Sequence, residues 1–216
     1  MRFFVLDKYN TWYDWRLTLT AKTLTDPEPK TNYVQIDGRS GTLDLSEALT
    51  GEVLYSDRTV TASFRSSEGT FQERAALMRT ITRALHGKKV RIQEPDDPEH
   101  YFLGRVKIKS AEQDQVHIAF TMEAVCDPWR YAAEETTRRV EPAGQTVQVV
   151  INNTGVKAVT PTITTEAPAT LTFAGETTTL QAGAYQIAGI KLAQGVNVVG
   201  VTSTGAVTFT YREADL

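Results

Sequence analysis

Apolar and polar residues alternate with a period of two along much of the first 130 residues. The alternating runs are residues 17–21, 60–64, 106–108 and 116–120. Because successive side chains of a strand point to opposite faces, this period predicts half-buried strands. The N-terminal part of the chain is therefore predicted to be mainly β.

One segment of this part has a different period. Its apolar residues are Phe71, Ala75, Met78, Ile81 and Leu85. This is the spacing of one face of a helix. Thr70 and Glu73 form a T-x-x-E capping box before it, and Gly87 follows it where a left-handed residue often ends a helix. The pattern predicts one helix over residues 71–86, which must bury its apolar stripe against a sheet or a partner.

The last third of the chain consists of short β-prone runs between turn signals. The runs are 146–151, 158–165, 169–173, 177–181, 185–190, 196–201 and 206–211. Seven such runs at close spacing, with no helical window, predict an antiparallel sandwich. Threonine is frequent in them, and its β-branched hydroxyl side chain fits the solvated face of a sheet.

Composition changes where these two patterns meet. Up to Arg130 there are 18 basic and 19 acidic residues, but from Tyr131 onward there are 5 and 7, with 17 threonines. A chain of 216 residues is long enough for one large or two small domains. We therefore predict an N-terminal domain over 1–130, a linker over 131–143 and a C-terminal domain over 144–216.

The overall composition excludes several classes of protein. The net charge of −3 lacks the basic excess of a dedicated nucleic-acid binder. The single cysteine, Cys126, excludes an intrachain disulfide framework. No apolar run approaches the length of a membrane span, and we expect no secretory signal at the N-terminus.

The sequence also lacks the motifs of common catalytic sites. There is no G-x-S-x-G elbow, P-loop, H-E-x-x-H or G-x-G-x-x-G. His86 is expected to end the helix, Cys126 to pack as a small apolar group, and residues 94–99 to form an acidic hairpin tip rather than a calcium loop. We therefore expect no enzyme activity, no metal and no cofactor.

Aromatic residues crowd the N-terminus. Trp12, Tyr13 and Trp15 lie within four residues of one another. Such side chains are core residues, anchors of an interface or, less often, a platform on which a sugar stacks. The sequence leaves these three alternatives open.

A second cluster lies on a predicted hairpin, residues 88–93 and 101–109. Its cations alternate with apolar residues and share one face: Lys89, Arg91, Arg105, Lys107 and Lys109. Asp96 and Asp97 lie at its acidic tip. The cations can form a solvated face, and the tip argues against nucleic acid because it would repel phosphate. A surface with both signs can also dock on a neighbouring copy in a closed ring, which makes these residues candidates for an oligomer contact.

The order of short motifs resembles that of a known family. Residues 33–45, YVQIDGRSGTLDL, resemble the strand and G-R-x-G-x-x-D signature of the distal tail proteins of long-tailed, non-contractile phages. Residues 123–131, EAVCDPWRY, are similar to the D-P-aromatic-R-Y close of the family's first domain. The segments 153–163, 195–197 and 205–212 are similar to parts of its second domain.

This resemblance implies a fold and a role. The fold would be mainly β: an N-terminal β-sandwich with one helix and a long hairpin, followed by a C-terminal galectin-like β-sandwich. The protein would form a hexameric hub ring at the distal end of the phage tail, within the virion. Its partners would be copies of itself, the tail tube protein and the tail-tip hub protein, with a receptor-binding protein as a further candidate and DNA passing through the channel.

The alternative is a carbohydrate-binding protein that recognises host-surface glycans through the C-terminal sandwich. The sequence offers few aromatic rings for this role. Beyond Tyr131 there are only Phe173, Tyr185, Phe209 and Tyr211, and no tryptophan. A galectin-like fold does not by itself establish sugar binding.

Overall fold

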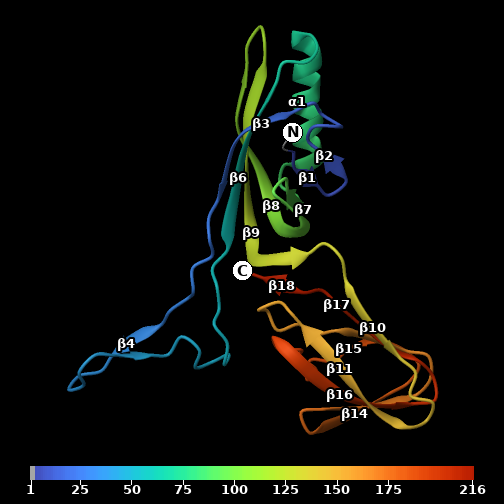
Figure 1. Ribbon diagram of the computed structural model, residues 1–216. Helices are drawn as coiled ribbons and strands as arrows, with labels where there is room; N and C mark the ends of the chain where they lie inside the picture. Colours follow the sequence, from blue (N-terminus) through green and yellow to red (C-terminus); the bar gives the residue numbers. More distant parts are fainter. Residues whose placement is uncertain (1–2) are drawn as a thin grey trace. The chain divides into compact units, whose positions relative to one another are not determined.

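The chain folds into two compact units, which are described separately. The computed structural model describes residues 3–216. The N-terminal unit comprises Met1–Trp129 with Leu216, and the C-terminal unit comprises Arg130–Asp215. Both consist mainly of strands (Figure 1), so the predicted fold class is confirmed.

A curled sheet forms the framework of the N-terminal unit. The spatial order of its strands is β2 (Tyr9–Asn10), β1 (Val5–Leu6), β7 (Lys89–Glu94), β8 (Asp97–Gln113), β9 (Ile118–Ala132), β6 (Arg58–Ser66) and β3 (Thr18–Leu24). β6 pairs with β9 in an unbroken antiparallel register, from Arg58 opposite Cys126 to Ser66 opposite Ile118. Alternate residues of these strands are buried, as the period of two predicts.

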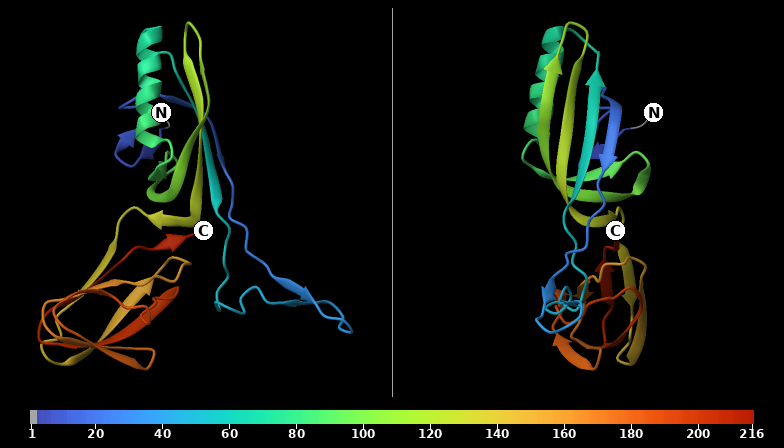
Figure 2. Two further views of the ribbon diagram at one scale, coloured as in Figure 1. Left: turned by 180° about the vertical axis from the view of Figure 1, so that it is seen from behind. Right: turned by 90° about the vertical axis from the view of Figure 1, so that its left-hand side faces the viewer.

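The helix α1 (Phe71–Leu85) lies along one face of this sheet (Figure 2). The capping box is confirmed: the Glu73 backbone N–H donates to Thr70 Oγ1 (3.3 Å), and the Thr70 N–H donates to Glu73 Oε2 (2.7 Å). The buried stripe differs from the prediction at its start. Phe71 is 49% exposed, whereas Arg74 is buried because its guanidinium donates to the carbonyls of Gly69 and Gln115.

The core between the helix and the sheet contains large side chains from α1, from the five strands β1, β6, β7, β8 and β9, and from the segments just before β1 and β3. Its largest fully buried members are Phe4, Leu6, Leu17, Phe64, Ile81, Leu85, Ile92, Phe102 and Met122. Because these residues come from distant parts of the chain, the core ties the N-terminal strands to the β7–β8 hairpin.

Between β3 and β6 the chain leaves the sheet as an extended hairpin, which we call the arm (residues 25–57). It contains the short pair β4 (Tyr33–Gln35) and β5 (Thr42–Asp44). Its two sides are also joined near its base, where Pro29 bridges Tyr55 and the Lys30 N–H donates to the Leu54 carbonyl. In the turn of the arm Gly38 and Gly41 have φ of 81° and 80°, a left-handed backbone that glycine adopts without steric strain.

Two four-stranded antiparallel sheets form the sandwich of the C-terminal unit. One has the order β10 (Thr136–Val140), β17 (Val207–Tyr211), β12 (Thr162–Thr165) and β15 (Gly183–Gln186). The other has the order β11 (Thr146–Asn153), β16 (Gly195–Ser203), β13 (Ala169–Phe173) and β14 (Glu176–Leu180). The core between them is mainly aliphatic, and its most deeply buried members include Phe209, Leu171 and Ile163.

The region expected to form a linker, residues 131–143, has regular structure. β9 continues to Ala132, and β10 pairs with β17 over five residues. In Thr136–Val140 only Val140 is apolar, so the sequence shows no alternation of apolar and polar residues there and predicts no strand. The chain end returns to this region, where β18 (Ala214–Asp215) pairs with Tyr131 and Arg130.

No helix within residues 3–216 is both long and apolar enough to cross a membrane.

Candidate functional site

The arm carries the largest group of exposed apolar side chains in the described chain. These are Tyr33, Val34, Ile36, Leu49, Val53 and Leu54, and Leu49 is 99% exposed. No residue between 25 and 54 is buried. A hairpin of this length cannot stabilise itself by burying its own apolar surface. Such a segment is typical of a surface that is covered by another protein chain.

The arm is also strongly acidic. Residues 25–57 contain seven acidic residues and two basic ones. Asp44 is fixed by its own turn, because its carboxylate accepts hydrogen bonds from the backbone N–H (2.9 Å) and the hydroxyl (2.5 Å) of Ser46. These bonds, the hydroxyl first, lower the pKa of Asp44. The Asp44 carboxylate therefore stabilises the backbone turn at Ser46.

Of the N-terminal aromatic residues, Trp15 belongs to the core. It is 6% exposed and stacks on Tyr9 with ring centroids 4.9 Å apart, so it is not available as an interface anchor. Trp12 is half-buried beneath the Arg16 guanidinium, 5.6 Å from the ring centre. Tyr13 is 66% exposed and makes an edge contact with Phe3. The structure thus leaves Tyr13, and part of Trp12, at the surface.

The five cations of the β7–β8 hairpin do share one exposed face, as predicted. Most of them have partners within the chain. Lys89 pairs with Asp127 (2.9 Å), Lys109 pairs with Glu123, and Arg105 donates to the Gly87 carbonyl. The Arg91 guanidinium lies over the Tyr101 ring, 5.0 Å from its centre.

Lys107 is the one of these five cations for which the described part of the chain supplies no such partner. The sequence could not show that Asp127 and Glu123 of β9 pair with these cations, because their position beside the hairpin depends on the order of the strands in the sheet. Intrachain pairing of exposed charges leaves this face much less basic than the sequence suggests.

The carboxylates of the hairpin tip are engaged as well. Lys22 of β3 pairs with Asp96 (2.9 Å) and with Glu94 (3.1 Å), and His100 pairs with Asp97 (2.8 Å). Within residues 3–216 no group of three or more metal-binding side chains comes together. His86 joins the helix to the sheet, since its Nδ1 accepts a hydrogen bond from the Ile108 N–H (3.1 Å).

Cys126 is buried (1% exposed) on β9, and burial, followed by the nearby Asp127 carboxylate, raises its pKa from 9.0 to about 12. We predict that the thiol of the folded protein is inert to Ellman's reagent at pH 8. Its thiolate fraction is roughly a thousandfold below that of the unfolded chain. Labelling in denaturant provides the control, and rapid labelling without denaturant would contradict the burial.

The raised pKa of Cys126 also makes stability depend on pH. The stability due to the neutral thiol is present below pH 9 and is lost as the pH rises towards 12.

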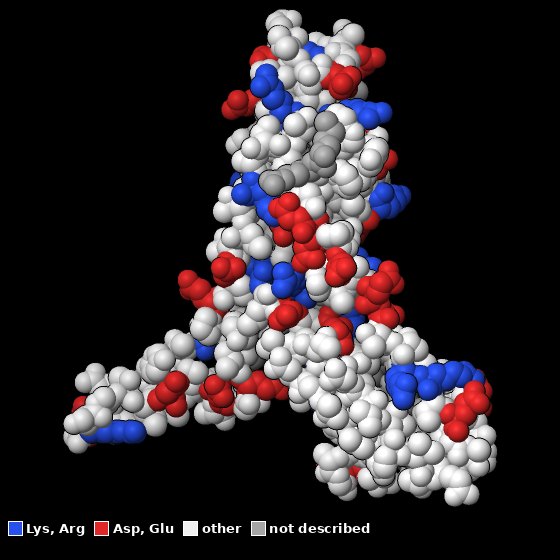
Figure 3. All heavy atoms as spheres, viewed as in Figure 1, with Lys and Arg blue, Asp and Glu red and all other residues white. Residues whose placement is uncertain are grey.

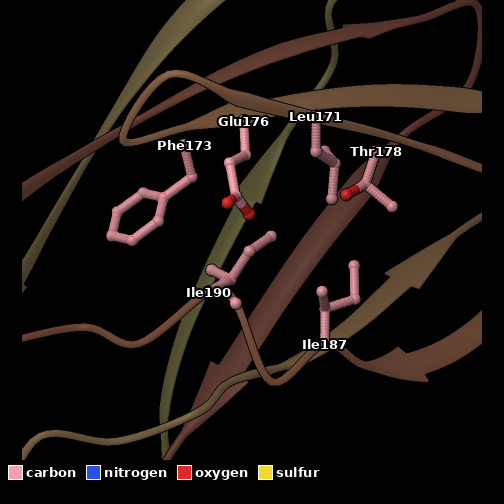
Figure 4. Close-up of a pocket in the computed structure, with 7 residues that line it drawn as sticks. Leu171, Phe173, Glu176, Thr178, Ile187 and Ile190 are labelled. Atoms are coloured by element: carbon pink, nitrogen blue, oxygen red, sulfur yellow. The ribbon is translucent and has the colours of Figure 1, made fainter.

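The C-terminal unit has a small pocket, but it has no room for a sugar ring. Its volume is about 20 Å³, the space of about one water molecule. Figure 4 shows Glu176 among the apolar side chains of Leu171, Phe173 and Ile190. Tyr211, one of the rings considered for stacking, is 5% exposed and donates its hydroxyl to the Asn152 carbonyl. The structure thus offers no support for a sugar site at these residues.

The outer face of the β11–β16–β13–β14 sheet is uncharged. A row of threonines crosses it from strand to strand: Thr146, Thr202, Thr170 and Thr179. Beyond them lie exposed valines, with Val150 at 52% and Val196 at 71%. Figure 3 shows few charged side chains on the visible face of this unit. A face of hydroxyl and methyl groups without charge suits contact with another protein surface.

Comparison with known proteins identifies a shared fold. No family model matches the chain, and no curated protein matches its sequence. The crystal structure of the Dit protein (gp 19.1) of SPP1, described as a paradigm of the hub adsorption apparatus of phages that infect Gram-positive bacteria, is similar over 100% of both chains. The TM-score is 0.71 and the identity is 15%. The predicted resemblance to distal tail proteins is thereby confirmed at the level of the fold.

A second similar structure is the activated baseplate of phage p2 with strontium. The alignment covers 99% of this chain and 98% of that one, with a TM-score of 0.48 and 8% identity. This similarity is too low to support an argument about function.

Proposed function

We propose that this protein is a structural subunit of a phage tail, a hub at the tail's distal end that forms a hexameric ring. In this role it joins the tail tube to the tail-tip or baseplate proteins, leaves a channel for DNA and catalyses no reaction. The observation that carries the proposal is the fold shared with the SPP1 hub protein over the whole chain. At 15% identity a shared fold does not settle function, so the surfaces of the chain must support the role independently.

The arm gives that support. A closed ring of identical subunits needs a head-to-tail contact between two unlike patches on each subunit. The arm suits such a patch, because it is acidic, exposes apolar side chains and is covered by no residue in the range 3–216. The uncharged face of the C-terminal sandwich suits contact with a further tail protein, such as a receptor-binding protein.

Oligomeric mass tests the proposal directly. Size-exclusion chromatography with light scattering is expected to give a species of six times the 23.9 kDa chain mass. Negative-stain images should show rings with a central channel. A protein that stays monomeric over the whole accessible concentration range, in low and in moderate salt, would contradict a ring that forms by itself.

A further inference from the structure

One border strand of the C-terminal sandwich has a long open edge. β11 (Thr146–Asn153) is the outermost strand of its sheet and pairs only with β16, over eight residues without a bulge. Half of the backbone N–H and C=O groups of such a strand point away from its neighbour. Within residues 3–216, one hydrogen bond from outside the sheet reaches this backbone, from the Tyr211 hydroxyl to the Asn152 carbonyl (2.7 Å). The rest of the edge is open to another backbone.

The other edge strands of the three large sheets have features that prevent a further strand from pairing with them. Natural proteins protect sheet edges with bulges, charged side chains and very short strands. In the N-terminal unit β3 has a bulge after Leu19 and carries Lys22, and β2 is two residues long. In the C-terminal unit β10 carries Arg138 and Arg139, β14 begins with Glu176, and β15 is four residues long.

β11 has none of these protective features. Its sequence, TVQVVINN, contains no charged residue and no proline. Its outward-facing side chains are all exposed and uncharged: Thr146, Gln148, Val150 and Asn152. An edge strand of this kind is a template to which an extended chain can add.

We propose that an extended, uncharged segment of a partner protein adds to β11 as a fifth strand of this sheet. Its backbone would bond to the open N–H and C=O groups of β11. Side chains alternate between the two faces of a sheet. Those beside Gln148 and Val150 would therefore be hydroxyl or small aliphatic groups, and those beside the buried Val149 and Ile151 would be aliphatic and extend the core. The partner segment is thus defined by alternating hydroxyl and aliphatic residues without charge.

A partner protein fits this edge better than a second copy of the chain. Two open β11 edges would pair across a twofold axis, which turns the two subunits in opposite directions. All subunits of the proposed ring point the same way, because the ring joins different proteins at its two ends. This choice of occupant therefore rests on the proposed function.

Hydrogen exchange of the full chain with a model strand tests the proposal. The probe is a peptide of alternating threonine and valine with two terminal lysines for solubility. With the peptide at ten times its dissociation constant, every second backbone N–H of β11 should exchange about tenfold more slowly, as read by residue-resolved mass spectrometry. Alternate protection is expected because only half of these groups point away from β16. The control peptide has proline in place of its central valines and should protect nothing.

Two lysine variants distinguish the edge from the outer face of the sheet. Val150 of β11 and Val198 of β16 lie directly opposite each other and are 52% and 47% exposed. Val150→Lys should weaken peptide binding about fivefold, because lysine is a poor cross-strand neighbour for valine or threonine. Val198→Lys is the matched control and should leave binding unchanged. Equal effects of the two variants would place the peptide on the face and overturn the proposal.

The remaining outcomes separate this proposal from the ring. The absence of alternate protection on β11, or equal protection by the proline peptide, would overturn the strand addition. A doubled mass of the protein alone that Val150→Lys abolishes would identify a second copy as the occupant and overturn the partner. Light scattering measures the ring independently. A hexamer without protection leaves the ring and removes the edge site, whereas protection without a hexamer does the reverse.

Discussion

Replacing residues 31–53 by an Asn-Gly turn is expected to convert the hexamer into a monomer without unfolding the N-terminal unit. The truncation removes every strongly exposed apolar side chain of the arm except Leu54, together with four of its carboxylates. It keeps Lys30 and Leu54, whose backbone hydrogen bond closes the base of the arm. Light scattering measures the loss of mass, and circular dichroism measures the folding.

Stability should hardly change, because the removed segment contributes no buried residue to the core. Changes confined to exposed positions typically alter the free energy of unfolding by no more than about 0.5 kcal/mol, and a shorter loop costs slightly less entropy to close. The matched control replaces residues 36–41, the tip between β4 and β5, with the same Asn-Gly turn and keeps the exposed apolar residues Leu49, Val53 and Leu54. A truncated chain that remains hexameric would show that the arm is not part of the ring contact.

The sequence predicted the helix and most strands because their signals are local. The capping box of Thr70 and Glu73, the apolar positions Ile81 and Leu85, and the left-handed Gly87 all act within a few residues of one another. The runs of the C-terminal unit were likewise found within a few residues of β11, β13, β14, β16 and β17. β10 was missed because its polar residues pair with β17, about 70 residues away in the chain.

The surfaces could not be predicted in the same way, because they depend on which distant residues meet. Lys89 and Lys109 looked like open charges until β9 placed Asp127 and Glu123 beside them. The sequence made Trp15 and Tyr13 equal candidates for an interface, but Trp15 is buried in the core and Tyr13 is exposed. The sequence does not reveal whether the apolar residues of the arm are buried. Only the three-dimensional structure shows that nothing in the described chain covers them.

The two units have separate cores, which makes their stabilities separable. We expect Phe209→Ala to destabilise the C-terminal unit by about 3–5 kcal/mol, the usual cost of removing a buried phenylalanine ring. Phe209 is 0% exposed on β17 and lies opposite Ile163 of β12 and Arg138 of β10, so a cavity would open at the centre of this sandwich. Differential scanning calorimetry should show a lower transition temperature for this unit alone.

The hexamer should survive this substitution at temperatures where the C-terminal unit is still folded, because the arm belongs to the N-terminal unit. The mirror experiment is Phe64→Ala, which removes a ring 1% exposed in the other core, where it packs against Phe4 and Phe120. This substitution should lower the transition temperature of the N-terminal unit and weaken the ring. Val196→Ala, on the outer face of the sandwich, serves as the surface control and should change neither transition. If Phe209→Ala shifted both transitions equally, the units would unfold as one, and the ring could not be assigned to the N-terminal unit on grounds of stability.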